Sequence, residues 1–94
     1  MSTYQIQPYS YKQAEKLGVL IVPSDNSKKK IDVYNKYGLY MCSIGQQPYK
    51  DYPTYLEQYG KEYAENRRRL YKIRHNKDRV IEGSAGYYSD NILW

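Results

Sequence analysis

Basic side chains that can bind an anion are concentrated in one segment, YAENRRRLYKIRHNKDR, at residues 63–79. On a helix, four of them recur at spacings of four, three and four residues and form one cationic stripe, Arg68, Lys72, His75 and Arg79. Residues 61–79 hold eight of the chain's 15 Lys and Arg residues and three of its 10 acidic residues. We therefore expect this segment to supply most of the positive field of a protein whose net charge is +5.

Three uses of this cationic segment fit the sequence. Bound to nucleic acid, the basic groups would contact phosphates, with Tyr71 stacking nearby, although no helix-turn-helix, zinc-finger or basic-zipper signature accompanies them. Bound to protein, the Arg side chains would pair with carboxylates. In the third interpretation the face is solvated, with Glu65 pairing to Arg69 one turn later. The candidate anion- or partner-binding residues are Arg67, Arg68, Arg69, Lys72, Arg74, His75, Lys77 and Arg79.

A structural role is an alternative for Arg74 and His75. An Arg at this place can donate to the carbonyls of the turn GSAGYY, or to the end of the chain at Trp94, and so hold the last element in place. The sequence leaves open whether these two side chains point outward to a ligand or inward to that last turn.

The sequence does not favour an enzyme. Cys42 is the one Cys and His75 the one His, so a Cys/His zinc site cannot be built, and nothing in their spacing brings them together as a catalytic couple. The GSAG stretch at 83–86 lacks the Lys that follows a phosphate-binding loop. We expect no catalytic residue, no metal, no cofactor and no small-molecule substrate.

Length and composition suggest one small domain over residues 1–94. The longest apolar run, at 19–22, is too short to cross a membrane, and the first residues do not resemble a signal peptide. The chain has 14 Tyr, one Trp and no Phe. Because tyrosine combines an apolar ring with a polar tip, it suits half-buried core positions and interfaces alike. The candidate interface aromatics are Tyr71, Tyr87, Tyr88 and Trp94.

The N-terminal half is expected to begin with an extended arm at 1–9. Residues 10–50 are expected to be mainly strand, with a short helix at their start. Ser10 is the predicted N-cap of that helix and Gly18 its C-terminal stop. The predicted strands are 17–22, 30–35 and 39–44, the last two joined in a hairpin with Gly38 in the turn. The run KKK at 28–30 is interpreted as mostly solvated.

The C-terminal half, residues 51–94, is expected to be mainly helical. Thr54 and Glu57 fit a capping pattern for a long helix near 53–78, which Gly60 bends or splits. Its predicted core-facing stripe consists of Leu56, Tyr59, Tyr63, Leu70 and Ile73. Ser84 is expected to cap a short final helix whose apolar end docks on the domain or on a partner. The predicted fold class is α+β, with a small antiparallel sheet of two or three strands packed on a long or bent basic helix.

Three stretches, DYPTY, RRRLYKIRHNKDR and GSAGYYSDNILW, resemble a family of short, uncharacterised proteins from large double-stranded DNA viruses of the mimivirus and chlorovirus kind. The resemblance covers residues 17–94, and its matching positions are Arg68, Arg69, Tyr71, Arg74, His75, Lys77, Asp78, Gly83, Ser84, Gly86, Tyr87, Leu93 and Trp94. It implies a viral source and supplies no mechanism.

Residues and resemblance together predict a non-enzymatic interaction module, a small structural or assembly protein of a large DNA virus. The expected partners are larger viral structural proteins, with localisation in the virion or the host-cell cytoplasm rather than secretion. The alternative is a basic accessory protein that binds nucleic acid.

Overall fold

The computed structural model describes residues 4–47 and 49–94, which contain four helices and a three-stranded antiparallel sheet. The predicted α+β class is confirmed. In chain order the elements are α1 (Pro8–Leu17), β1 (Leu20–Pro23), β2 (Lys29–Tyr34), β3 (Tyr40–Gln46), α2 (Tyr52–Tyr59), α3 (Lys61–Arg74) and α4 (Ala85–Leu93). No helix in the described ranges is long and apolar enough to span a membrane.

The sheet has the order β1-β2-β3, so β2 is central and β3 lies at an edge. The predicted hairpin is confirmed: Val33 pairs with Cys42 and Ile31 with Ile44, and Gly38 in the turn has φ 83°. The side chain of Asn35 supports the turn, because its Oδ1 accepts from the backbone N–H groups of Tyr37 and Leu39.

One face of the sheet carries the core. Ile31 and Val33 of β2 are fully buried, because α1 and α4 contact each other and pack over this face. The buried cluster consists of Ile6, Ala14, Val19, Ile21, Ile31, Val33, Ile44, Tyr88, Ile92 and Leu93. The side chain of Ser10 links the two helices, since its Oγ donates to the carbonyl of Ile92 at 2.8 Å.

Several predicted boundaries in the N-terminal half are wrong. Helix α1 begins at Pro8 with Gln7 in the N-cap position, so Ser10 lies inside the helix and the extended arm ends before residue 8. Residues 1–3 of that arm lie outside the described residues. The first strand begins at Leu20 rather than at 17, because Gly18 ends the helix with φ 72°, as predicted.

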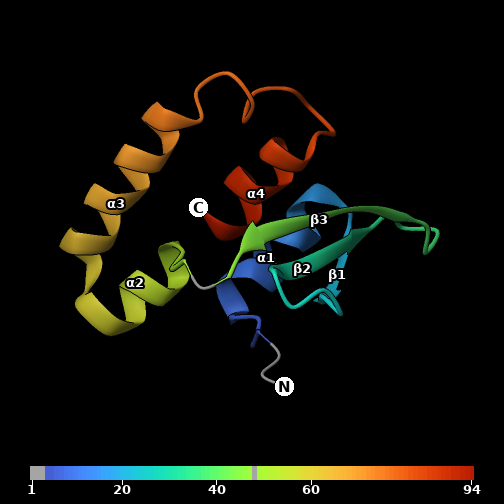
Figure 1. Ribbon diagram of the computed structural model, residues 1–94, viewed down its shortest axis with the longest axis horizontal. Coiled ribbons are helices and arrows are strands. Elements are labelled where there is room, and N and C mark those ends of the chain that lie inside the picture. The colour runs from blue at the N-terminus through green and yellow to red at the C-terminus, as the bar shows by residue number, and fades with distance from the viewer. Residues whose placement is uncertain (1–3, 48) are drawn as a thin grey trace.

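The predicted long helix is divided at Gly60, whose φ is 90°. The N-cap of α2 is Asp51, whose side chain accepts from the N–H of Thr54 at 3.0 Å, so Thr54 is not the cap. Ser84 caps α4 as predicted, with its Oγ accepting from the N–H of Tyr87 at 3.2 Å. Figure 1 shows α2 and α3 as an arch beside the sheet, with the end of α4 pointing into the arch.

Four of the five residues of the predicted core stripe in the helical half are exposed, and the fifth, Leu70, is only partly buried. Tyr63 is 46% exposed and Ile73 62% exposed, and Leu56 and Tyr59 are exposed as well. The buried residues of α3 are instead Ala64 and Tyr71. The prediction was wrong because α3 packs on the rest of the fold through an alanine and aromatic rings on a neighbouring face. Helical spacing alone does not show which of two apolar faces is packed.

Candidate anion-binding cleft

A cleft of about 630 Å³ lies between α3, the end of β3 and α4. The four lining cations with no carboxylate partner among the described residues are Lys29, Lys50, Arg67 and Arg74. Aromatic residues and consecutive residues of β3 also line the cleft, among them Tyr49, Tyr55, Tyr71 and Trp94 with Ser43, Ile44, Gly45 and Gln46. We call this site the basic cleft.

A run of stacked rings forms the inner wall of the cleft. Tyr71 lies between two rings, with the centroid of His75 at 4.3 Å and that of Trp94 at 4.4 Å. The ring planes of Tyr71 and Trp94 differ by 7°, and the ring centroids of Trp94 and Tyr55 lie 6.1 Å apart. The Tyr71 hydroxyl donates to Ser89 Oγ at 3.1 Å. This aromatic stack, from His75 to Tyr55, links the arch to the end of α4.

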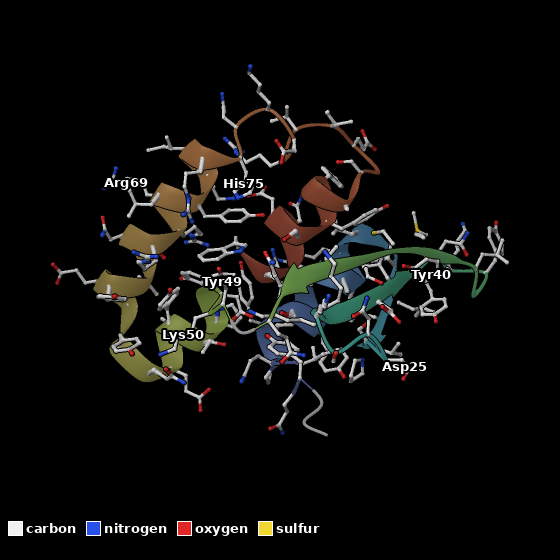
Figure 2. The ribbon with its side chains drawn as sticks, viewed as in Figure 1. Asp25, Tyr40, Tyr49, Lys50, Arg69 and His75 are labelled. Carbon is white, nitrogen blue, oxygen red and sulfur yellow. The ribbon has the colours of Figure 1, made fainter. Side chains whose placement is uncertain are left out.

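The stack fixes the direction of His75. Its ring packs on Tyr71 and its Nδ1 lies 3.3 Å from Asp78 Oδ2, so the side chain faces its own fold. Figure 2 shows His75 on the inner side of α3 and Arg69 on the outer side, pointing away from the body. The guanidinium of Arg69 bonds to the amide oxygen of Asn66 at 2.9 Å rather than to Glu65.

Arg68 anchors α3 to the end of α4. Its Nη2 donates to both carboxylate oxygens of Glu65 at 2.6 and 2.7 Å, and its Nη1 donates to the carbonyl of Trp94 at 3.4 Å. The bond from Arg68, followed by that from the Tyr52 hydroxyl, lowers the pKa of Glu65. The predicted structural lock on the end of the chain is therefore made by Arg68, whereas no hydrogen bond of Arg74 is found among the described residues.

Lys72 and Arg79 also bind to groups of their own fold. Lys72 Nζ lies 2.7 Å from Asp90 Oδ1 on α4, and that carboxylate belongs to a buried residue. Arg79 Nε donates at 3.1 Å to the backbone carbonyl of Lys72 in the last turn of α3. The predicted cationic stripe thus becomes a paired face, made of Arg68, Lys72, His75 and Arg79, that holds α4 and the connection after α3.

The cations of the basic cleft that α3 supplies lie on another side of the helix. Arg67 and Arg74 are seven residues apart, which places them on one side of the helix, facing the basic cleft. The guanidinium carbon of Arg67 lies 5.4 Å from the Tyr55 ring centroid, and its Nε finds no hydrogen-bond partner in the part of the chain that the structure describes. Lys50 donates to the hydroxyl of Tyr59 at 2.8 Å. Asp78 is the one carboxylate in the described lining, and it already contacts His75.

A buried ion pair beneath the cleft was not predicted. Lys30 and Asp51 are only 5% and 1% exposed, and Nζ lies 2.9 Å from Oδ2. The Tyr4 hydroxyl donates to the same carboxylate oxygen at 2.6 Å. The solvated interpretation of 28–30 is therefore wrong for Lys30, because the chain returns from β3 and places Asp51 over it. The separation of 21 residues between Lys30 and Asp51 gives no local signal of a pair.

The remaining candidate residues are distributed between core and surface. Tyr88 is buried in the core cluster, Tyr87 packs against that cluster, and Lys77 is exposed on the connection after α3. Cys42 packs against the core, where burial raises its pKa and disfavours the thiolate, while His75 lines the cleft. Within residues 4–47 and 49–94 no group of three His, Cys, Asp or Glu side chains is placed to hold a metal ion.

The geometry of the basic cleft suits the binding of an anion. Unpaired cations surround a lining that also offers rings and backbone groups, and such a site attracts negative charge and orients a flat or extended ligand. Comparison of the chain with protein-family models, with curated proteins and with solved structures finds no significant match.

The buried tyrosines predict a loss of stability in alkali. Burial, followed by the charge of Asp51, raises the pKa of Tyr4, and burial also raises the pKa of Tyr71. A tyrosine whose pKa is higher in the folded than in the unfolded state favours folding while it is protonated in both states, at pH values below the ordinary pKa of 10.0. This contribution to stability is lost as the pH rises above that value. We expect the urea midpoint to fall above pH 10, and less steeply in Tyr4→Phe than in wild type. The exposed Tyr37→Phe is the control, and equal slopes in all three proteins would contradict the prediction.

Proposed function

We propose that this protein is a non-enzymatic interaction module that binds an acidic segment of a protein partner in the basic cleft. The partner class follows from the chemistry of the lining, since Arg and Lys side chains pair with carboxylates and the surrounding rings and backbone groups suit a peptide. The sequence resemblance adds the context of a large DNA virus, in which the partner is a larger structural protein. Mass spectrometry of purified particles would test that context.

The observation that carries the proposal is the division of the cations around α3. On the paired face, Arg68 and Lys72 are neutralised by Glu65 and Asp90. In the basic cleft, Arg67 and Arg74 have no acidic partner among the described residues. Two cations of the paired face thus have carboxylate partners, while the cations of the basic cleft keep an uncompensated positive field, which favours an acidic partner.

Binding of single-stranded nucleic acid is the second candidate. Tyr49 supports it, because this ring is 67% exposed and lies beside Lys50, so a base has a free surface to stack on. The other rings support it less, since Tyr71 is already stacked on both faces by His75 and Trp94. The protein partner is therefore the first choice.

The test is a binding measurement with charge-reversal variants. The probe is a fluorescent peptide of alternating Glu and Val, compared with an oligothymidylate of similar charge. We expect the peptide to bind wild type, and Lys29→Glu/Arg74→Glu to weaken binding at least about tenfold, because each lost charged hydrogen bond contributes about 1.5–3 kcal/mol. Raising the salt concentration should weaken binding as well.

The control variant is Lys36→Glu/Arg69→Glu, which changes the net charge equally on surfaces away from the cleft. Lys36 lies in the hairpin turn, and Arg69 lies on the outer side of α3. Equal weakening by the two double variants would reduce the effect to overall charge and would count against the cleft. Binding of the oligonucleotide but not of the peptide would replace the first candidate by the second.

A further inference from the structure

We infer that the acidic segment binds as an added β-strand, paired to the free edge of β3 inside the basic cleft. This inference rests on the proposed function and specifies how the partner is held. Strand addition to an open sheet edge supplies affinity through backbone hydrogen bonds, while alternate side chains supply specificity.

The edge of β3 is open in the described structure. The order β1-β2-β3 gives β3 one strand neighbour, and its residues 43–46 line the cleft. In Figure 1 the arrowhead end of β3 points towards the arch. An unpaired edge is a template for another strand unless it is covered or carries charges that repel one.

The direction of the backbone groups follows from the hydrogen bonds of β2. The carbonyl of Lys30 accepts from Ser24 on the β1 side at 3.0 Å. Successive residues of a strand turn their N–H and C=O to opposite sides, so Ile31 directs its groups towards β3, where its partner is Ile44. Ser43, one residue before Ile44, therefore directs its own N–H and C=O away from β2 and towards the cleft.

Gly45 lets the backbone of β3 pack closely against buried side chains beside the cleft. A Cβ at Gly45 would lie 2.7 Å from Leu93 Cδ1 and 2.9 Å from Lys30 Cδ, and the residue has φ 76°. The backbone of β3 thus passes closely over the core next to the cleft, without a side chain at this position.

The charges select the occupant of the edge. Lys29, Arg67 and Arg74 around the edge would repel the same cations of a second copy. The net charge of +5 on each copy adds to this repulsion. A peptide with alternating acidic and apolar residues matches the mixed lining, because its two faces have a period of two residues. Its acidic side chains are placed for the cations and its apolar ones for the rings of Tyr49 and Trp94.

The experiment uses two N-methylated forms of the Glu/Val peptide with the full-length protein. One form is methylated at every Glu amide and the other at every Val amide, so charge and composition match. In a paired strand one set of amides faces β3 and the other faces away. We expect one methylated form to bind at least about tenfold more weakly than the other, since two lost hydrogen bonds at about 1 kcal/mol each exceed the 1.4 kcal/mol of a tenfold change.

Amide hydrogen exchange provides the second readout. The N–H of Ser43 should exchange more slowly when the unmodified peptide is bound, while that of Tyr37 in the hairpin turn should not change. Equal affinities of the two methylated peptides would overturn strand addition and leave the proposed function intact if Lys29→Glu/Arg74→Glu still weakens binding. No binding by any of the peptides would overturn both, and a concentration-dependent dimer that protects Ser43 would assign the edge to a second copy.

Discussion

Asp51→Ala is expected to lower the free energy of unfolding by about 3–5 kcal/mol, because it leaves the buried ammonium of Lys30 without its counterion. The same carboxylate accepts from Lys30 Nζ at 2.9 Å, from the Tyr4 hydroxyl at 2.6 Å and from the N–H of Thr54 at 3.0 Å. Its removal therefore also deletes the N-cap of α2, which contributes about 1 kcal/mol in other helices. The arch begins at this residue, so its attachment to the sheet should weaken first.

Urea unfolding followed by circular dichroism measures this effect. Asp25→Ala, in the exposed loop before β2, is the matched control and should change stability by less than about 0.5 kcal/mol. The double variant Lys30→Met/Asp51→Ala should recover part of the loss, because no buried charge is then left alone. A loss below about 1 kcal/mol in Asp51→Ala would show that water or rearrangement compensates Lys30, and that the pair does not hold the arch.

Local sequence chemistry was sufficient for the elements whose determinants are close together in the chain. The hairpin was predicted from Gly38 and the alternation around Ile31, the end of α1 from Gly18, and the cap of α4 from Ser84. Each of these signals acts within a few residues. The N-caps of α1 and α2 were misassigned because several polar residues lie near each helix start, and the capping geometry decides among them.

The site was predictable in composition but not in geometry. The sequence locates the excess of positive charge in 61–79, yet the side chains that neutralise Lys72 and Lys30 are 18 and 21 residues away. Helical phasing alone made the stripe with Lys72 the candidate binding face, whereas the structure uses that stripe internally. The lining of the basic cleft includes Lys29 and Lys50, which come from outside the basic segment, and only the fold brings them beside Arg67 and Arg74.

The abundance of Tyr and the absence of Phe also follow from contacts that only the fold shows. Tyrosine replaces phenylalanine at positions where the ring packs and the hydroxyl needs a polar partner. Tyr71 stacks on two rings while its hydroxyl reaches Ser89, and Tyr52 lies under the Arg68 guanidinium while its hydroxyl reaches Glu65. The arch is thus attached by rings with polar ends, and this arrangement allows a helix with little apolar burial to stay beside the core.

Trp94→Ala is expected to release α3 from α4 and to lower the free energy of unfolding by about 3 kcal/mol, at the lower end for a large aromatic because Trp94 is only partly buried. The substitution removes the ring that lies between Tyr71 and Tyr55. Amides of α3 should then exchange faster with solvent than those of β2, since the core cluster keeps its own contacts. Peptide binding in the basic cleft should weaken together with the loss of α3.

The control is Tyr37→Ala in the hairpin, where an aromatic ring is 77% exposed and its loss should change stability by less than about 0.5 kcal/mol. Trp94→Phe should restore most of the lost stability, because a smaller ring can still stack on Tyr71. Circular dichroism is the suitable probe, since Trp94 is the only tryptophan and its fluorescence disappears in the variants. If Trp94→Ala unfolds at the urea concentration of wild type, the arch is held by Arg68 and Lys72 through their ion pairs rather than by the aromatic stack.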